Sequence, residues 1–595
     1  MNLLVRRISL LLLLPQANVW AANDLGMDDA TIRGALKNIA VDTSIYAPKA
    51  PLSAKDARLS SDLRELVAFR SKDIRTQNPF LAKTMGISDA PEKVNVVITA
   101  PKTDVLEKLR QQLGASGITI GDKLYVSVAI ADLDKLAQND AIQYIQPQGF
   151  VSLPPNYQSR FQRKSSDSDG IGVINAKLLH NKGITGKGIK VGILDFGFAG
   201  YSELKARNLL PEPAATQIFN VNGDITGAGV AHGTGVAEII HAVAPDARLY
   251  LASVGLKGGA SEEEVIKGMR WLADQNVDII NFSGGGHAVA HDGSALQDQI
   301  INSLVERGIL WVNASGNEGD NHFATLTSDD NGNDWIDVPG SQVGDFVLFK
   351  TSGRGIRVLA NWDAWQAGPG RPRDDIDLFL FRVEQNGNAS EIARSVISQR
   401  NGERPLEVIQ GRVPPGVYAI GVRKVRLSGR RPIHLYLDGD VGGFYPKTAL
   451  GSVGSPGTAV RALTVGAIAV DSLKLEGFSS QGPTDDQRNK PELVAPDGVR
   501  SAAFELVDGH AVFQGTSAAA PHAAGFAALL KQLNPASRGE QLKADVIKAT
   551  SLMDSLPNNS TGSGMIDARK VTGNAGNNES PGAKEALKPL INILR

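Results

Sequence analysis

The sequence predicts an α/β protein built on a doubly wound parallel sheet, with an α+β module before it and an antiparallel β-sandwich inserted into it. Three observations support this fold class. Strand-like and helix-like segments alternate over 171–320 and 449–570, as they do in parallel sheets. The order strand–helix–strand–strand–helix–strand at about 94–146 is that of a ferredoxin-like module. Short alternating runs broken by Gly, Pro and Asn over 321–448 are typical of an antiparallel sandwich.

Composition narrows the class of protein. The chain has 595 residues, of which 42% are hydrophobic and 21% charged, as expected of a globular protein with more than one domain. Its formal net charge of −1 argues against a nucleic-acid binder, because no basic excess can release counterions. The sequence has no cysteine, which excludes a disulfide framework and a thiolate metal site.

The N-terminus has the features of a secretory signal peptide. Arg6 and Arg7 precede an apolar run at 8–14, and 19–21 supplies small residues at the outer positions of a cleavage site. We expect residues 1–21 to be removed, with a retained anchor as the alternative. No later stretch reaches about 18 apolar residues, so the mature chain is expected to have no membrane span and to be secreted or periplasmic.

Residues 22–150 are expected to form a propeptide that contains the ferredoxin-like module. The segment 151–170 is rich in Ser, Arg, Asp and Pro, which is typical of an exposed linker. A folded module, a cleavable linker and a large domain together indicate a removable segment, with an ordinary N-terminal domain as the alternative. The polar tail 571–595 is expected to be loosely held.

The segment 515–532 predicts a glycine turn that places the hydroxyl of Ser517 in the first turn of a helix of small residues. The start of a helix presents unpaired N–H groups and the positive end of the helix dipole, so negative charge developing beside Ser517 would be favoured. Taken alone, the pattern is more often a serine N-cap on a core helix. Other parts of the chain favour the functional interpretation of Ser517 over the structural one.

A serine hydroxyl needs a base to become a nucleophile, and the base needs a carboxylate to orient it. Asp195 ends an apolar strand, and His232 begins a helix between Ala231 and Gly233. Parallel sheets place their chemistry beyond the carboxyl ends of their strands. Each residue alone is more often structural, but the three together predict a carboxylate, a base and a nucleophile.

Four motifs resemble those of the subtilase family of subtilisin-like serine peptidases. Together they lie within 171–320 and 449–570, and the last is highly specific while the first is weak alone. In that family the carboxylate precedes the histidine and the histidine precedes the serine, as they do here. The motifs are Gly-Ile-Leu-Asp-Phe-Gly at 192–197, His-Gly-Thr-Gly-Val-Ala at 232–237, Ala-Ser-Gly-Asn-Glu-Gly at 314–319 and Gly-Thr-Ser-Ala-Ala-Ala-Pro-His at 515–522.

The resemblance implies a role for each catalytic residue. Ser517 would be the nucleophile, His232 the general base and then acid, and Asp195 the orienting carboxylate. Asn317 would be the side-chain donor of the oxyanion hole, together with the Ser517 N–H. The alternative for Asn317 is a turn residue in the left-handed conformation.

The resemblance also implies which residues bind substrate. An extended segment would pair with the substrate backbone, and small residues would line the pocket for the side chain before the scissile bond. A roomy pocket of this kind suggests a large apolar side chain. The segment comprises Ser283, Gly284 and Gly285, and the pocket residues are Ala314, Gly316 and Gly454.

Two residues depart from the family pattern. Phe196 stands where Thr or Ser is usual after the aspartate, which removes one supporting hydrogen bond. Gly284 stands where Leu is common, which puts the depth of the neighbouring subsite in doubt. Neither change removes a catalytic atom.

The resemblance implies a secreted endopeptidase made as a self-processing precursor, with protein or peptide substrates and its own propeptide as intramolecular inhibitor. An exopeptidase on the same scaffold and a catalytically silent protein that binds through its β-sandwich are the alternatives. The chemistry needs no cofactor or metal. The sandwich resembles a pre-peptidase C-terminal module, and its acidic cluster at 374–378 could hold structural calcium, although a solvated turn is favoured.

Overall fold

The computed structural model describes residues 27–37, 39, 41, 53–68, 93–113, 117–153, 170–365, 374–399 and 403–572. The expected signal peptide lies outside these residues, as do 154–169 of the expected linker and 573–595 of the expected tail. Among the helices of the described ranges, none is long and apolar enough to cross a membrane.

A nine-stranded sheet forms the centre of the larger domain, in the order β23-β24-β20-β19-β11-β10-β6-β8-β7. Every neighbouring pair in it is parallel except β23 with β24. The α/β class with a parallel sheet is therefore confirmed. Its strands are β6 (Lys190–Asp195), β7 (Ala215–Ile218), β8 (Arg248–Ser253), β10 (Ile279–Phe282), β11 (Leu310–Ala314), β19 (Leu463–Ala469), β20 (Leu493–Asp497), β23 (Thr550–Ser551) and β24 (Met565–Ile566).

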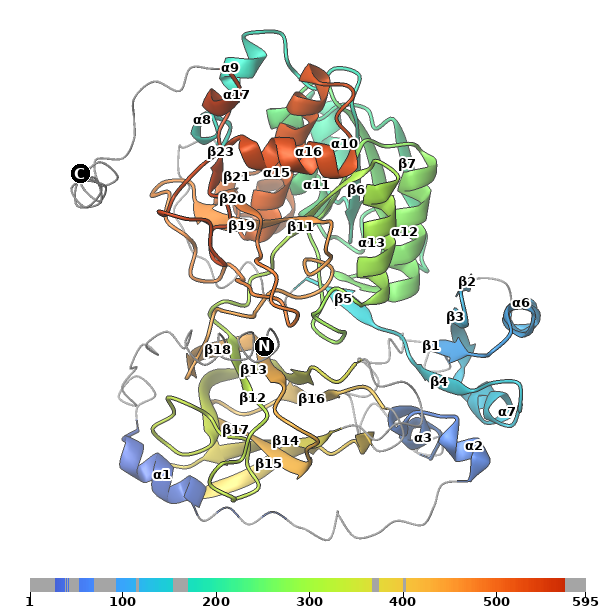
Figure 1. The fold of residues 1–595 in the computed structure, drawn as a ribbon, viewed down its shortest axis with the longest axis vertical. Coiled ribbons are helices and arrows are strands. Elements are labelled where there is room, and N and C mark those ends of the chain that lie inside the picture. The colour runs from blue at the N-terminus through green and yellow to red at the C-terminus, as the bar shows by residue number, and fades with distance from the viewer. Residues whose placement is uncertain are drawn as a thin grey trace, which may run out of the picture.

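Helices cover both faces of this sheet (Figure 1). Strand residues alternate between two hydrophobic cores, so that Val312 packs on one face with α11 and α15, and Trp311 packs on the other with α12 and α13. The helices are α8 (Gly170–Val173), α9 (Lys177–His180), α10 (Tyr201–Ala206), α11 (His232–Val243), α12 (Glu262–Asp274), α13 (Leu296–Glu306), α14 (Ala502–Asp508), α15 (Thr516–Leu533), α16 (Gly539–Lys548) and α17 (Arg569–Thr572).

Seven antiparallel strands between β11 and β19 form a second sheet with its own core, below the first in Figure 1. Hydrogen bonds join all seven into one sheet, where the short alternating runs predict a two-sheet sandwich. The 17-residue β13 makes this possible, because it pairs with β17 through 346–351 and with β16 through 355–361. The strands are β12 (His322–Leu326), β13 (Phe346–Trp362), β14 (Asp375–Val383), β15 (Ala389–Ser395), β16 (Leu406–Arg412), β17 (Gly416–Arg426) and β18 (Pro432–Tyr445).

The acidic cluster of this sheet is not the solvated turn that its composition favours. Asp374, Asp375 and Asp377 are 1–2% exposed at the start of β14. Asp374 accepts a hydrogen bond from Arg431 Nε at 2.9 Å, and the Gln399 N–H donates to Asp375 at 3.2 Å. That prediction was wrong, because partners distant in sequence compensate these carboxylates and allow them to be buried.

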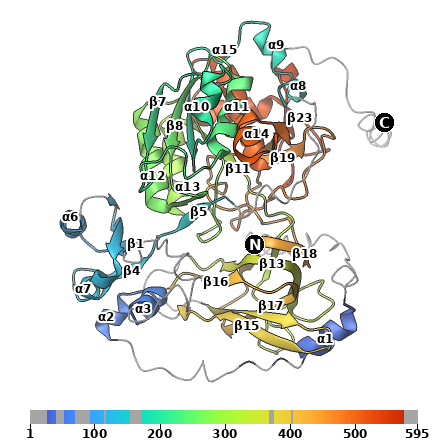
Figure 2. The same cartoon turned by 180° about the vertical axis from the view of Figure 1, so that it is seen from behind.

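Residues 93–147 form a small module, seen from behind in Figure 2. Its strands form an antiparallel sheet in the order β2-β3-β1-β4, and the element order along the chain is the predicted one. Leu106 of α6 and Leu133 of α7 pack in its core. Its elements are β1 (Lys93–Thr99), α6 (Thr103–Gln112), β2 (Ile118–Ile120), β3 (Lys123–Ala129), α7 (Leu133–Ala137) and β4 (Tyr144–Pro147), preceded by the helices α1 (Asp29–Lys37), α2 (Ala54–Ala57) and α3 (Ser61–Ala68).

Candidate active site

The three residues predicted to carry the chemistry lie where parallel strands end and helices begin. Asp195 is the last residue of β6, which lies between β10 and β8 in the interior of the sheet. His232 is the first residue of α11, and Ser517 is the second residue of α15. Their exposed fractions are 0%, 3% and 4%, so all three are buried within the protein.

Asp195 and His232 form a closely contacting pair. Both carboxylate oxygens lie 2.9 Å from His232 Nδ1, and the Phe196 N–H donates to Asp195 Oδ1 at 2.8 Å. A carboxylate can only accept, so Nδ1 bears the ring proton and Nε2 of the neutral imidazole bears the lone pair. His232 is therefore held in the tautomer that can accept a proton at Nε2.

The Ser517 hydroxyl is engaged elsewhere in this structure. It donates to the Ser283 carbonyl at 3.2 Å, while His232 Nε2 is buried without a hydrogen-bond partner. A buried nitrogen without a hydrogen-bond partner lowers the stability of the fold, and a catalytic role is one reason for a protein to keep one. The backbone before the serine is fixed by Gly515, whose φ of 108° suits glycine and whose N–H donates to Asp497 Oδ2 at 2.9 Å.

Asn317 is anchored to the start of α15 through its side-chain oxygen. Asn317 Oδ1 accepts from both the N–H and the hydroxyl of Thr516, each at 3.0 Å. The amide nitrogen is the end left to donate, and Asn317 lines the same cavity as Ser517. The alternative of a left-handed turn residue does not hold, because the positive φ in this motif belongs to Gly316, at 110°.

The predicted substrate-pairing segment already has a strand beside it. The short strand β5 (Phe150–Ser152) pairs antiparallel with β9 (Gly259–Ser261). Leu153 N continues this pairing by donating to the Gly258 carbonyl at 2.7 Å, and on the other side of β5 Ser152 N donates to the Gly285 carbonyl at 3.2 Å. Ser152 and Leu153 line the cavity that contains Ser517. The chain's own residues therefore lie where an extended peptide would add a strand.

The two departures at Phe196 and Gly284 compensate each other in packing. A Cβ atom placed on Gly284 would lie 2.7 Å from Cε2 of the Phe196 ring. The ring therefore fills the space that a larger residue at 284 would use, while the Phe196 N–H still supports Asp195. The sequence shows the two changes, but only the packing shows that they compensate each other.

The cavity beside Ala314, Gly316 and Gly454 is lined by charged groups, unlike the apolar pocket that these small residues predict. A Cβ on Gly316 would lie 2.4 Å from Glu318 Oε2, and one on Gly454 would lie 2.5 Å from His287 Nδ1. His287 Nε2 lies 3.4 Å from Glu318 Oε1.

The inserted sheet adds an ion pair to this cavity, because Arg357 Nε donates to Asp438 Oδ2 at 2.8 Å and both residues line it. Sequence reasoning did not identify Arg357, Asp438, His287 or Glu318 as residues of this cavity. Of these four, only Glu318 could have been found, since it follows Asn317 directly.

Comparison with known proteins adds an independent observation. A family model described as "Subtilase family" matches residues 186–433 and 438–565. The alkaline protease of Alkalihalobacillus alcalophilus is 32% identical over 209 residues, covering 33% of this chain and 49% of that protein. The minor extracellular protease Vpr of Bacillus subtilis is 26% identical over 449 residues, covering 67% of this chain and 53% of that protein.

The chain thus spans about half the length of these curated relatives. Among solved structures, the CspB protease of Clostridium perfringens is similar with a TM-score of 0.48 and 18% identity, covering 67% of this chain and 94% of that one.

Proposed function

Because the chain belongs to the subtilase family, we propose that it is a serine endopeptidase in which Ser517, His232, Asp195 and Asn317 carry the reaction. The observation that supports this most is the His232 ring. Asp195 holds its Nδ1 proton, and its Nε2 lone pair is buried and unused. Such a nitrogen is prepared to take a proton from a neighbouring hydroxyl.

The first half of the reaction follows from these positions. The Ser517 hydroxyl turns from the Ser283 carbonyl toward His232 Nε2, which removes its proton as Oγ attacks the peptide carbonyl. Negative charge develops on the carbonyl oxygen. The Asn317 amide and the Ser517 N–H, which lies in the first turn of α15, donate hydrogen bonds to that oxygen.

In the second half, His232 returns its proton to the leaving amine, which leaves an acyl group on Ser517. Water then enters, gives a proton to His232 Nε2 and attacks the acyl carbon. The bond from that carbon to Ser517 Oγ breaks, His232 returns the proton to Oγ, and the carboxylic acid leaves. Asp195 stabilises the imidazolium at each step without taking a proton itself.

The position of β5 indicates where an extended substrate would bind. A peptide in place of 150–153 would pair with the backbone at Gly258 and Gly285, which makes affinity depend on an extended main chain. We propose that residues 22–150 act as an intramolecular inhibitor, because this segment leads directly into β5, which pairs with the backbone groups that substrate would use. The precursor would be secreted and would cleave itself.

Cleavage of the full chain tests this function. We expect the wild-type precursor to lose its N-terminal portion and to cut casein at internal bonds, while Ser517→Ala stays full length and inactive. Short N-terminal fragments alone would favour an exopeptidase instead. A folded wild-type chain that neither processes itself nor cuts casein would favour a silent binding protein and would refute the proposal.

A further inference from the structure

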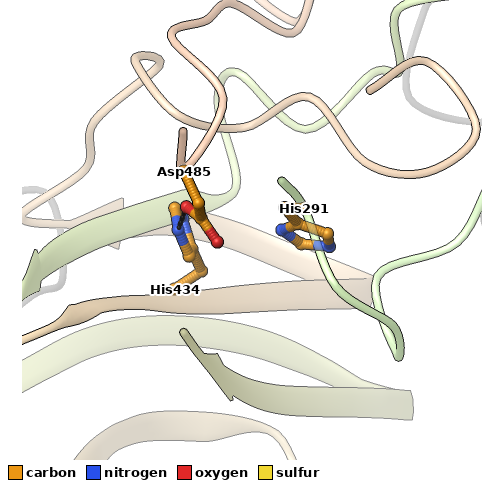
Figure 3. Close-up of side chains that lie close together, drawn as sticks. All are labelled: His291, His434 and Asp485. Atoms are coloured by element: carbon orange, nitrogen blue, oxygen red, sulfur yellow. Dashed lines mark hydrogen bonds and ion pairs between the residues drawn. The ribbon is translucent and has the colours of Figure 1, made fainter. Parts of the chain in front are cut away.

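A buried group of histidines lies where the inserted sheet meets the larger domain. His291 comes from the loop between β10 and α13, His434 from β18, and Asp485 from the loop between β19 and β20. Figure 3 shows the three side chains, from separate segments, converging on one point. One ligand atom of each lies within 4.8 Å of the others. None of these residues takes part in the proposed peptidase chemistry.

Hydrogen-bond directions fix the protons on two of the rings. His322 Nδ1 lies 2.7 Å from the Thr448 carbonyl oxygen, which can only accept, so Nδ1 bears the proton of His322. In the tautomer with its proton on Nδ1, Nε2 of His322 bears the lone pair. That lone pair lies 3.0 Å from His434 Nδ1, which must therefore donate.

This chain of hydrogen bonds leaves two acceptor atoms, His434 Nε2 and Asp485 Oδ1, facing each other. The His434 tautomer that donates from Nδ1 has its lone pair on Nε2, and this atom lies 2.8 Å from Asp485 Oδ1. Two acceptors at this distance repel unless a proton or a metal cation lies between them. The residues therefore require either an imidazolium–carboxylate pair or a bound cation.

The third side chain favours the cation. The His291 ring is 2% exposed, and one of its nitrogens lies within 4.8 Å of the ligand atoms of both His434 and Asp485. An imidazolium–carboxylate pair makes no use of a second imidazole placed beside it. Two imidazole nitrogens and one carboxylate oxygen are, by contrast, a common ligand set for zinc.

We propose that His291, His434 and Asp485 bind a divalent transition-metal ion of the zinc class. Ligand atoms around a tetrahedral zinc ion lie about 3.3 Å apart, given bonds of about 2.0–2.1 Å. The His434–Asp485 separation of 2.8 Å would open slightly, and His291 would move inward. Calcium is disfavoured, because it takes six or more oxygen ligands.

A path to the site exists along a neighbouring cavity. Its volume is about 320 Å³, and its lining runs from the exposed residues Asp330 and Arg430 to His434 and Asp485. The cavity gives an ion an entrance that reaches His434 and Asp485. The ion would join one strand of the inserted sheet to two loops of the larger domain.

The site is one layer of side chains from the candidate active site. The Tyr436 hydroxyl lies 3.3 Å from His291 Nδ1, and the Tyr436 ring stacks on His287 with centroids 3.8 Å apart. His287 lines the cavity beside Ser517. Metal binding would thus steady a wall of that cavity, although the proposal does not depend on the peptidase function.

Metal titration of the full-length Ser517→Ala chain tests the proposal, since this variant is expected to remain uncleaved. We expect the chelator-treated protein to take up one equivalent of Zn²⁺ in competition with a chromogenic chelator. Co²⁺ should give the visible d–d absorption of a four-coordinate nitrogen and oxygen site. His291→Gln, His434→Gln and Asp485→Asn should each lose this uptake, whereas His510→Gln, at an exposed histidine elsewhere, should keep it.

A further variant tests the direction of the hydrogen bonds. His322→Gln leaves the three ligands in place but removes the ring that fixes the tautomer of His434, so Zn²⁺ affinity should fall about 10–100-fold. Unchanged affinity in that variant would contradict the mechanism. Absence of Zn²⁺ uptake by the folded chain would overturn the proposal and leave the imidazolium–carboxylate pair. Uptake that survives in all three ligand variants, or a preference for Ca²⁺, would also overturn it.

Discussion

The Asp195→Asn substitution probes how this structure holds its histidine. The Phe196 N–H donates to Asp195 Oδ1 at 2.8 Å, so an asparagine would keep its oxygen at that position. Its amide nitrogen would then take the place of Oδ2, 2.9 Å from His232 Nδ1, and donate to it. The ring proton would move to Nε2, which could no longer accept the proton of Ser517.

The expected loss is about 10⁴-fold in the rate of the chemical step, the size of effect seen when the same change is made in trypsin-like enzymes. This corresponds to about 5.5 kcal/mol of transition-state stabilisation. Self-cleavage of the full-length precursor, followed over time on gels, measures the rate without added substrate. Asp278→Asn is a matched control, because Asp278 directly precedes β10, at the opposite end of the strands from Asp195, and accepts from Lys190 N.

Thermal denaturation should show both variants folded. A rate within about 10-fold of the wild type for Asp195→Asn, in a folded protein, would refute the argument from tautomers.

Three further predictions follow from packing and charge. Gly284→Leu should lower the free energy of unfolding by about 1–3 kcal/mol through overlap with the Phe196 ring, and Phe196→Thr in the same chain should recover part of it; a thermal double-mutant cycle without coupling would contradict this. Burial raises the pKa of Asp298 to about 6 from 3.8, so its contribution to stability is full below pH 3.8 and lost by about pH 6. The free energy of unfolding should therefore fall with pH between these two values, and Asp298→Asn should remove this fall when unfolding is measured with denaturant. An unchanged pH dependence would exclude Asp298 as its cause. Glu318→Gln should weaken cleavage after Lys and Arg relative to Leu in a peptide panel, and an unaltered ratio would exclude Glu318 from the pocket's selectivity.

The sequence predicts the parts of the molecule that depend on local pattern. The alternation of strands and helices gave the parallel sheet, and strand ends placed Asp195 near the helix start at His232. Ser261 and Glu264 have the three-residue spacing of a capping box, and the box is present at the start of α12, since Ser261 Oγ accepts from Glu264 N and Ser261 N donates to Glu264 Oε2. Each of these features rests on local patterns of strand, helix and cap.

Features that depend on distant partners could not be predicted in this way. Asp374 looked like part of a solvated turn because nothing in its neighbourhood reveals Arg431. The apolar pocket expected from small residues is instead charged, because the inserted sheet brings Arg357 and Asp438 to it. The direction of the Ser517 hydroxyl depends on packing against Ser283, and no spacing encodes it.

The most direct measurement of the central claim is the mass of the protein after reaction with a fluorophosphonate, which labels activated serines. We expect a single adduct on Ser517 in the wild type, and its disappearance in a folded His232→Ala variant, because the hydroxyl needs His232 Nε2 to give up its proton. A wild-type chain that remains unlabelled, or is labelled at another serine, would contradict the assignment of this site.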